Sequence, residues 1–259
     1  MLVNNINPVL LKIGFLEIRY YGLFYVIGFI MTYFMINYLA KKKNINLSKN
    51  DVSDLLLYAA VGMLIGARLF YVLIYNLSFY ISNPIRIFAL WEGGLSFHGA
   101  LVGIVIAGYL FCKKKNIDFY KLADVVVIPA ALALMLGRIG NFINSELYGR
   151  ITNLPWGVKF KDAEGFRHPS QIYEALKNLL MFIVLWNIKE KNLPKGFMFW
   201  LFVTMYGFLR FFIEFFREPD PQLGFFFSHF TMGQILTAIM FVTGIIMLYR
   251  LKKHQNKSY

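Results

Sequence analysis

Seven long apolar windows constrain this chain more than any other feature of its sequence. They cover roughly residues 20–40, 54–76, 95–112, 122–143, 171–188, 196–216 and 230–249. Each approaches the roughly 20 residues that a helix needs to cross a membrane core. Hydrophobic residues make up 58% of the 259 positions, so a soluble fold would have too little polar surface to cover them. We therefore predict an all-α integral membrane protein with seven transmembrane helices in one membrane domain, residues 1–259.

The basic residues indicate how these helices are oriented. The net charge of +13 is concentrated after the first, third, fifth and seventh windows, in "KKKNINLSK", "KKKNIDFYK", "KEKNLPK" and "RLKKHQNK". The positive-inside rule places these loops in the cytoplasm, with the N-terminus outside and the C-terminus inside. The alternative explanation of the charge is a nucleic-acid patch, but its periodic placement favours orientation, so we predict no nucleic-acid partner. The one sizeable external segment, residues 147–169, predicts a small extracytoplasmic cap.

Polar residues interrupt the outward end of the fourth window, in "GRIGNFINSELYGR", residues 137–150. Arg138 falls about six residues before the predicted exit, roughly 9 Å deep at 1.5 Å per residue. A charged side chain at that depth is rare without a partner or a task. The alternative is that Arg138 snorkels to its own interface.

Other polar residues share this level under the predicted topology. In the sixth window, Arg210 and Glu214 lie one helical turn apart, which is also typical of a structural ion pair. His98 begins the third window and is a candidate base, although histidines near helix starts are more often structural. Tyr21 begins the first window, where an aromatic-belt residue is expected as well. Arg68, in the outward half of the second window, has no role that the sequence decides.

The convergence of these residues predicts a site in the outer leaflet. Two arginines at headgroup depth suit a phosphate, because planar guanidinium groups match its oxygens and keep their charge. Gly99, Gly103, Gly137 and Gly140 allow helices to approach closely or leave room for a ligand. The predicted ligand is a phospholipid headgroup.

At these residues the sequence resembles the bacterial prolipoprotein diacylglyceryl transferases. "GRIGNFINSELYG" fits every fixed position of that family's signature, G-R-x-G-N-F-x-N-x-E-x-x-G. The resemblance extends to "RYYG", "SFHGAL", "RHPSQIYEA", "YGFLRFFIEFFREPD" and "MGQIL". The chain departs from some members in its short segment between Gly149 and His168, where they carry a larger insertion.

The resemblance implies an enzyme at the external face of the bacterial cytoplasmic membrane. Phosphatidylglycerol would donate its sn-1,2-diacylglyceryl group to the lipobox cysteine thiol of a prolipoprotein, giving a thioether and glycerol 1-phosphate. The leaving group would be a phosphate, whose growing charge explains the arginines. No metal or other cofactor is expected, and the partners would be phosphatidylglycerol, the lipobox segment and membrane lipids.

The resemblance also implies roles for individual residues. Arg138 would bind the headgroup phosphate, and Arg210 would be a second phosphate clamp oriented by Glu214. His98 would take the thiol proton, with Tyr21 or water as alternatives. The remaining signature residues would hydrogen-bond the glycerol head, orient Arg138 or close the turn: Asn141, Asn144, Glu146 and Gly149.

Two other classes of membrane protein fit the sequence less well. A secondary transporter would place its charges nearer the midplane and show repeat symmetry, and the chain shows neither. A non-catalytic membrane protein would not require both Arg138 and Arg210 in apolar windows.

Overall fold

The computed structural model describes residues 2–218 and 231–255. They divide into two compact units. The first unit holds residues 1–34 and 123–259, and the second holds residues 35–122. Two helices, α1 and α5, contribute residues to both units.

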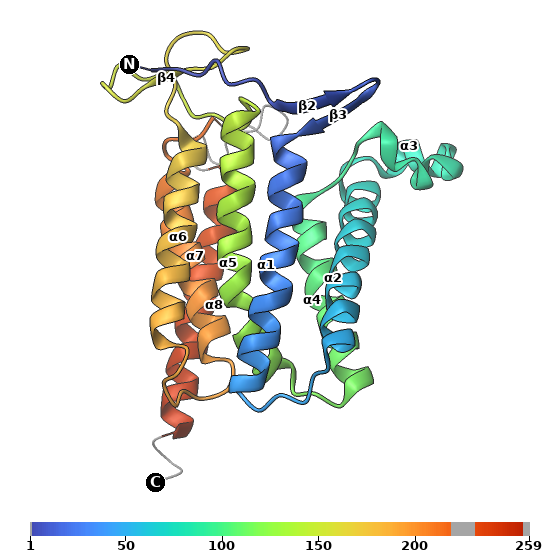
Figure 1. Cartoon of the computed structure of the whole chain (residues 1–259), viewed down its shortest axis with the longest axis vertical. Helices are drawn as coiled ribbons and strands as arrows, with labels where there is room; N and C mark the ends of the chain where they lie inside the picture. Colours follow the sequence, from blue (N-terminus) through green and yellow to red (C-terminus); the bar gives the residue numbers. More distant parts are fainter. Residues whose placement is uncertain (1, 219–230, 256–259) are drawn as a thin grey trace. The chain divides into compact units, whose positions relative to one another are not determined.

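Each predicted apolar window overlaps one long helix (Figure 1). These helices are α1 (Tyr20–Lys42), α2 (Lys49–Phe70), α4 (Phe97–Lys115), α5 (Phe119–Ile143), α6 (Ser170–Ile188), α7 (Phe197–Ile213) and α8 (Met232–Gln255). In the described part of the chain, α1, α5, α8 and α2 with its π-helical extension Tyr71–Tyr75 are long and apolar enough to cross a membrane. The chain is therefore a mostly helical, multi-pass membrane protein. The number of seven spans and the orientation of the termini stay predictions.

Capping residues set where the helices of the second unit begin and end. Ser48 and Asp51 form a capping box before α2, because the Ser48 hydroxyl accepts from the Asp51 amide at 3.1 Å and the Asp51 carboxylate accepts from the Ser48 amide at 2.8 Å. At the other end of this unit, α4 stops at Asn116, whose φ of 54° is the left-handed conformation typical of helix C-termini.

Glycines bring α2 and α4 into close contact within the second unit. A Cβ atom on Gly103 would lie 2.0 Å from the Gly62 carbonyl oxygen, and one on Gly66 would lie 2.3 Å from that of Gly99. Real Cβ atoms do not come this close to backbone atoms. The close approach predicted for Gly99 and Gly103 is therefore confirmed, and its partners are two glycines of α2.

Arg68 has a structural task in the second unit. Its side chain is buried and donates to five backbone carbonyls, at 2.5–3.2 Å. The acceptors belong to Arg86, Ile87, Ala89, Gly93 and Gly94. They follow the short helix α3 (Leu77–Ser82), in and after the 3₁₀ turns η2 (Pro84–Phe88) and η3 (Leu90–Glu92). Arg68 thus ties this irregular segment to α2, because its one side chain donates to carbonyls from residue 86 to residue 94.

In the first unit, α7 packs against both α6 and α8. The contact with α8 is close, since a Cβ on Gly207 would lie 2.6 Å from the Phe241 amide nitrogen. One on Gly244 would lie 2.3 Å from the Thr204 hydroxyl oxygen. This packing fixes the end of α7 beside the start of α8, where the charged residues of the candidate site lie.

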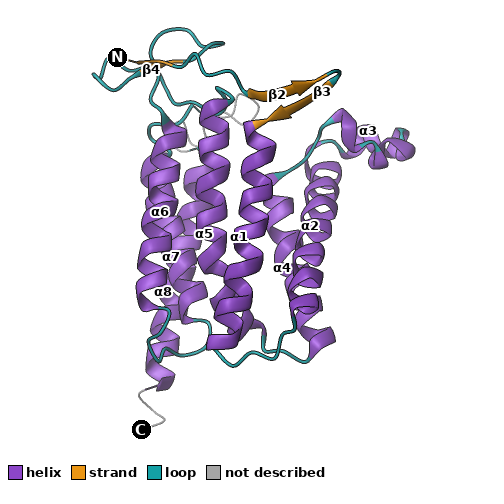
Figure 2. Ribbon diagram, in the orientation of Figure 1, coloured by secondary structure: helices purple, strands orange, loops and turns teal. Residues whose placement is uncertain are grey.

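The all-α prediction is incomplete, because short strands pair outside the helices (Figure 2). Strands β2 (Val9–Ile13) and β3 (Leu16–Arg19) form an antiparallel hairpin, turning at Gly14 with a φ of 60°. Strand β1 (Leu2–Val3) runs parallel to β4 (Val158–Lys159), within the predicted cap. This pairing satisfies backbone amide and carbonyl groups in segments that lie outside the apolar windows and so form no helix.

Candidate functional site

The chain turns sharply where α5 ends, inside the signature. The Asn144 amide donates to the Gly140 carbonyl at 3.0 Å, and the Glu146 amide donates to the Asn141 carbonyl at 2.9 Å. Ser145 has a positive φ of 58°, which reverses the backbone direction at this point. The signature therefore places its polar side chains together at the helix end.

Contacts from α6 and from Asn144 hold this turn. The Gln171 side-chain amide donates to the Glu146 carbonyl at 2.6 Å, and the Ser170 hydroxyl donates to the Leu147 carbonyl at 2.8 Å. The Asn144 side chain donates to the Glu146 carboxylate at 2.6 Å. Asn144 therefore orients Glu146.

Tyr21 lies against the signature helix. A Cβ on Gly140 would lie 2.8 Å from the Tyr21 ring, so only glycine leaves room for the ring there. The Tyr21 hydroxyl is 2.9 Å from that of Tyr25, and its other polar neighbours are Asn141 and Glu146. The structure therefore brings Tyr21, Asn141 and Glu146 together, as the sequence predicts.

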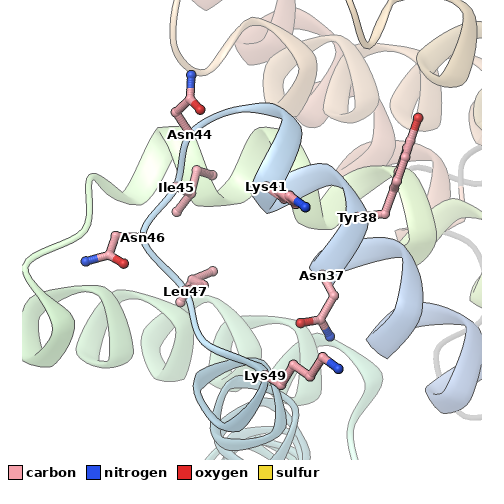
Figure 3. A pocket seen from close by; sticks show the side chains of 8 residues that line it. All are labelled: Asn37, Tyr38, Lys41, Asn44, Ile45, Asn46, Leu47 and Lys49. Atoms are coloured by element: carbon pink, nitrogen blue, oxygen red, sulfur yellow. The ribbon is translucent and has the colours of Figure 1, made fainter.

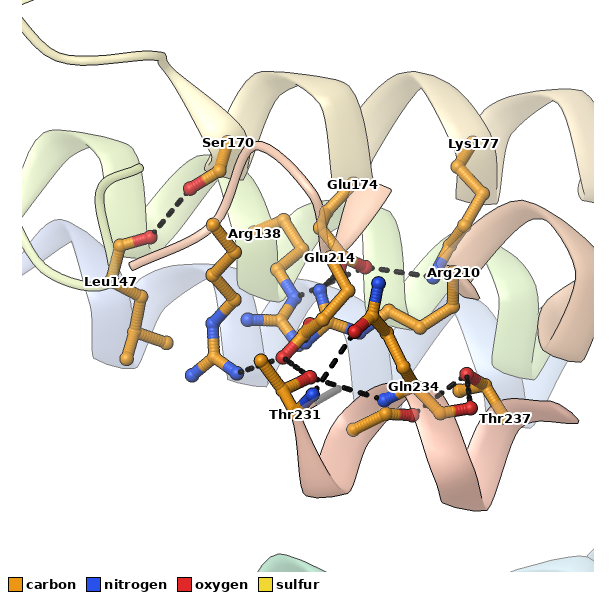
Figure 4. A network of polar contacts seen from close by, with 12 residues as sticks. Arg138, Leu147, Ser170, Glu174, Lys177, Arg210, Glu214, Thr231, Gln234 and Thr237 are labelled. Carbon is orange, nitrogen blue, oxygen red and sulfur yellow. Dashed lines mark hydrogen bonds and ion pairs between the residues drawn. The ribbon is translucent and has the colours of Figure 1, made fainter. Parts of the chain in front are cut away.

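A buried carboxylate on α6 joins the predicted arginines (Figure 4). One oxygen of Glu174, Oε1, accepts from Arg210 Nη1. The other, Oε2, is 2.7 Å from Lys177 Nζ and 3.9 Å from Arg138 Nε. The side chain of Glu174 is only 3% exposed, so these contacts form away from water. Together with Glu214, these four residues are called the arginine cluster below.

Arg210 is held by two carboxylates. Besides its bond to Glu174, its Nη2 atom lies 2.5 Å from Glu214 Oε2, one helical turn along α7. The predicted Arg210–Glu214 pair is therefore confirmed as a contact. Buried ions lose hydration, and their loss is offset only where partners satisfy them closely. Glu174 meets that condition with a hydrogen bond to Nη1, and Glu214 adds a close opposite charge at Nη2.

The start of α8 stabilises Glu214. The Thr231 hydroxyl donates to Glu214 Oε1 at 3.1 Å. Thr231 and Gln234 also form a capping box, with amide-to-side-chain distances of 3.0 and 3.2 Å. A Cβ on Gly233 would lie 2.6 Å from Glu214 Oε1. The motif "MGQIL" therefore places a glycine and a positive helix end next to the carboxylate that holds Arg210.

Arg138 is much less engaged than Arg210. Among the residues that the structure describes, its one polar contact is the 3.9 Å approach of Nε to Glu174. Its side chain is 20% exposed, and a Cβ on the preceding Gly137 would meet nothing within 4 Å. Both Nη atoms of Arg138 are thus left for a ligand, whereas those of Arg210 bind carboxylates.

The cluster carries excess positive charge. Three of its residues are cations and two are carboxylates, and Arg217 adds a cation 3.8 Å from Glu214. The described residues at this place therefore sum to a formal charge of +2. Preorganised positive charge in a buried site is suited to an anion whose charge grows during a reaction.

Two predicted site residues, His98 and Gly149, are not members of the arginine cluster. His98 belongs to the second unit, in the first turn of α4, with its ring 6.4 Å from that of Phe70. Its placement beside the arginines stays a prediction. Gly149 lies where the cap passes the end of α7. A Cβ added at Gly149 would be 2.3 Å from the Phe216 carbonyl oxygen and 2.7 Å from His168 Cβ.

The sequence reasoning missed two members of the cluster, Glu174 and Lys177. Both lie in an apolar window, three residues apart, so the opposite charges at neighbouring helix positions were the available signal. Glu174 also belongs to the motif "RHPSQIYEA". The last two residues of "YGFLRFFIEFFREPD", 219 and 220, lie outside the described residues.

Other features of the described residues do not compete with this site. A hollow of about 630 Å³ lies where α1 is connected to α2, lined by asparagines and lysines (Figure 3). It contains none of the predicted site residues. No group of three or more His, Cys, Asp or Glu side chains in the described part of the chain is placed to hold a metal ion.

The fold and the cluster define a class: a helical membrane protein with a buried cationic site suited to an anionic headgroup. A family model described as prolipoprotein diacylglyceryl transferase matches residues 8–250. The chain therefore belongs to the prolipoprotein diacylglyceryl transferase family.

Three relatives illustrate this membership, and each is named phosphatidylglycerol–prolipoprotein diacylglyceryl transferase. The protein of Geobacter sulfurreducens is 47% identical over 245 residues, which cover 94% of each chain. That of Desulfotalea psychrophila is 43% identical over 97% of this chain and 95% of its own. That of Rickettsia canadensis is 45% identical over 94% of this chain and 96% of its own.

Proposed function

We propose that this chain transfers the sn-1,2-diacylglyceryl group of phosphatidylglycerol to the lipobox cysteine thiol of prolipoproteins, the first step of lipoprotein maturation. The names of its relatives support the donor and the acceptor class. The single observation that carries the proposal is the buried cluster in which Arg210 is fixed by two carboxylates and Arg138 keeps both Nη atoms open.

The proposed reaction is a substitution at carbon. The acceptor thiolate attacks the glyceryl carbon that is bonded to a phosphate oxygen, so a carbon–sulfur bond forms while that carbon–oxygen bond breaks. The electron pair of the broken bond stays on the oxygen, and glycerol 1-phosphate leaves. The phosphate charge rises from about −1 to nearly −2, since a phosphate monoester has its second pKa near 6. The formal +2 of the cluster together with Arg217 complements that product.

The cluster residues take different parts in this reaction. Arg138 binds the headgroup phosphate through its two Nη atoms, because a planar guanidinium matches two phosphate oxygens. Arg210 is the second phosphate clamp, and its direction is set by Glu174 and Glu214. Cations already ordered before the reaction stabilise the leaving group without a reorganisation cost.

The other signature residues serve the glycerol head and the thiol. Asn141, Asn144 and Glu146 hydrogen-bond the glycerol hydroxyls, and the ordered Asn144–Glu146 contact supports this role. His98 takes the thiol proton, since its ordinary pKa lies near neutrality. Water, or Tyr21 beside Asn141, is the alternative participant in activating the thiol.

We also propose the membrane arrangement on which this mechanism depends. Seven helices span the bacterial inner membrane as one domain, with the N-terminus and residues 147–169 outside and the C-terminus inside. The site then opens to the outer leaflet and to translocated prolipoproteins, with no role for nucleic acid. Reporter fusions test this: those at Lys43, Lys115, Lys191 and the C-terminus report cytoplasm, and one at Lys161 reports the outside. A cytoplasmic signal at Lys161 contradicts the arrangement.

The function itself is tested with purified protein, phosphatidylglycerol vesicles and a peptide carrying a lipobox cysteine. The expected products are a peptide heavier by one diacylglyceryl group and one equivalent of glycerol 1-phosphate. A peptide with serine in place of the cysteine is the control and stays unmodified. Absence of the heavier peptide, or transfer of a phosphate-containing group to it, contradicts the proposal.

A further inference from the structure

Lys177 is a buried lysine inside a predicted membrane helix. Its side chain is 2% exposed, and it lies seven residues into α6, roughly 10 Å from the helix start. An ammonium group at such depth is costly, so it needs compensation. It has two partners: Glu174 Oε2 at 2.7 Å, and the face of the Tyr206 ring at 3.8 Å from Nζ. The mechanism above gives Lys177 no part beyond its share of the formal charge of the site.

The position of Lys177 matters because it shares one oxygen with Arg138. Glu174 Oε1 is taken by Arg210, so Oε2 is the oxygen left for other cations. Lys177 hydrogen-bonds Oε2, whereas Arg138 Nε stays at 3.9 Å, beyond hydrogen-bond range. Both cations thus compete for the same acceptor, and Lys177 holds it.

We propose that Lys177 is a positioning residue that keeps Arg138 ready for the phosphate by occupying Glu174 Oε2. The inference rests on the proposed function, in which Arg138 binds the headgroup. Without Lys177, Glu174 keeps one hydrogen-bonded cation, and its free oxygen attracts the nearest remaining charge. Arg138 would then close by about 1 Å to the usual charge-assisted distance. Phosphatidylglycerol would have to displace Glu174 before it could bind.

This competition predicts a defect in lipid affinity that a second substitution reverses. Lys177→Met removes the ammonium and raises the KM for phosphatidylglycerol about tenfold, a change typical of one close charge pair. Turnover at saturating lipid falls much less, because an intrinsic binding competitor is overcome by substrate. Adding Glu174→Gln removes the competing negative charge but leaves an amide oxygen that can still accept from Arg210, which Glu214 also holds. KM therefore returns to within about threefold of the unsubstituted protein.

The experiment compares four proteins: the unsubstituted chain, Lys177→Met, Lys177→Met with Glu174→Gln, and the control Lys191→Met. Lys191 is an exposed lysine beyond the end of α6, and its loss leaves KM unchanged. KM and kcat are measured with graded phosphatidylglycerol in mixed micelles and the lipobox peptide. Thermal unfolding of each protein reports whether it is folded. If Lys177→Met gives no folded protein, Lys177→Gln replaces it with the same expectations.

The inference is overturned if the KM of folded Lys177→Met equals that of the unsubstituted protein. It is also overturned if the double substitution leaves KM as high as Lys177→Met does, because a merely structural lysine would give that result. If the unsubstituted chain forms no thioether, the proposed function has failed instead. Direct binding of phosphatidylglycerol to the same four proteins then tests the competition by itself.

Discussion

Substituting Gly149 with alanine tests why the signature ends in glycine. Here the chain of the cap runs antiparallel to the end of α7, with Gly149 opposite Arg217. The added Cβ would lie 2.3 Å from the Phe216 carbonyl oxygen, whereas real Cβ atoms stay at least 3.0 Å away. The carbonyl must therefore retreat by about 0.7 Å. It accepts from the Arg150 amide at 2.9 Å, which would stretch to about 3.6 Å, too long for a hydrogen bond.

The magnitude follows from this broken contact. Losing one backbone hydrogen bond and leaving its groups partly unsatisfied costs about 2–3 kcal/mol. On the scale of globular proteins of this size, the thermal midpoint falls by roughly 4–10 °C. Phe216 lies two residues after Glu214, so the displacement also disturbs the carboxylate that orients Arg210. Turnover should fall by roughly 10- to 10²-fold, as for other small misplacements of a site.

Three measurements on Gly149→Ala check this reasoning. Thermal unfolding in detergent gives the midpoint, the transfer assay gives turnover, and limited trypsin cleavage at the exposed Lys161 reports loosening of the cap. Gly108→Ala is the matched control, because its Cβ would make only an ordinary 3.8 Å contact with Phe119. A Gly149→Ala protein with the midpoint, turnover and cleavage rate of the control would refute the packing explanation.

Three further predictions concern single side chains. Arg138→Lys keeps the charge but loses the two-pronged contact, so kcat/KM falls by about 10²–10³; turnover near that of the unsubstituted protein would reduce Arg138 to a snorkelling residue. His98→Gln keeps lipid binding and lowers turnover by roughly 10²–10⁴, with partial recovery between pH 7 and 10; undiminished turnover at neutral pH would remove His98 from the mechanism. Burial lowers the pKa of His168 below its ordinary value, so the folded chain takes up its proton less readily than the unfolded chain. The contribution of His168 to stability is complete above about pH 6.5 and is lost as pH falls below that value. Between pH 8 and pH 5 the thermal midpoint of the unsubstituted protein should therefore fall more than that of His168→Gln. Parallel midpoint curves of the two proteins would contradict this prediction.

The helices could be predicted because an apolar composition over a short stretch of sequence is enough to indicate a membrane span. The apolar windows placed the ends of the long helices to within about six residues: α5 was predicted at 122–143 and found at 119–143, whereas α2 was predicted at 54–76 and found at 49–70. The Arg210–Glu214 pair was equally accessible, because helical spacing brings residues four apart together. The short strands were not, since β1 and β4 pair across more than 150 residues of sequence.

Contacts between helices explain what the sequence left open. Glu174 acquires its role only because α6 packs beside α7, which brings the Glu174 carboxylate to Arg210. Spacing along one helix cannot indicate such a contact. The task of Arg68 depends on five carbonyls of an irregular segment that has no sequence pattern of its own. Gly149 was expected to close a turn, but its smallness is required by Phe216, a neighbour on another element.

The central claim is that the arginine cluster stabilises a phosphate leaving group while the thiolate attacks carbon. It is tested most directly with phosphatidylglycerol carrying ¹⁸O in the ester oxygen between the diacylglyceryl carbon and phosphorus. After a single turnover with the lipobox peptide, mass spectrometry locates the label. Because the carbon–oxygen bond breaks, all of the label is expected in glycerol 1-phosphate, and the peptide gains an unlabelled diacylglyceryl thioether. Label recovered in free diacylglycerol would show that the oxygen–phosphorus bond breaks instead, which rules out attack of the thiolate at carbon.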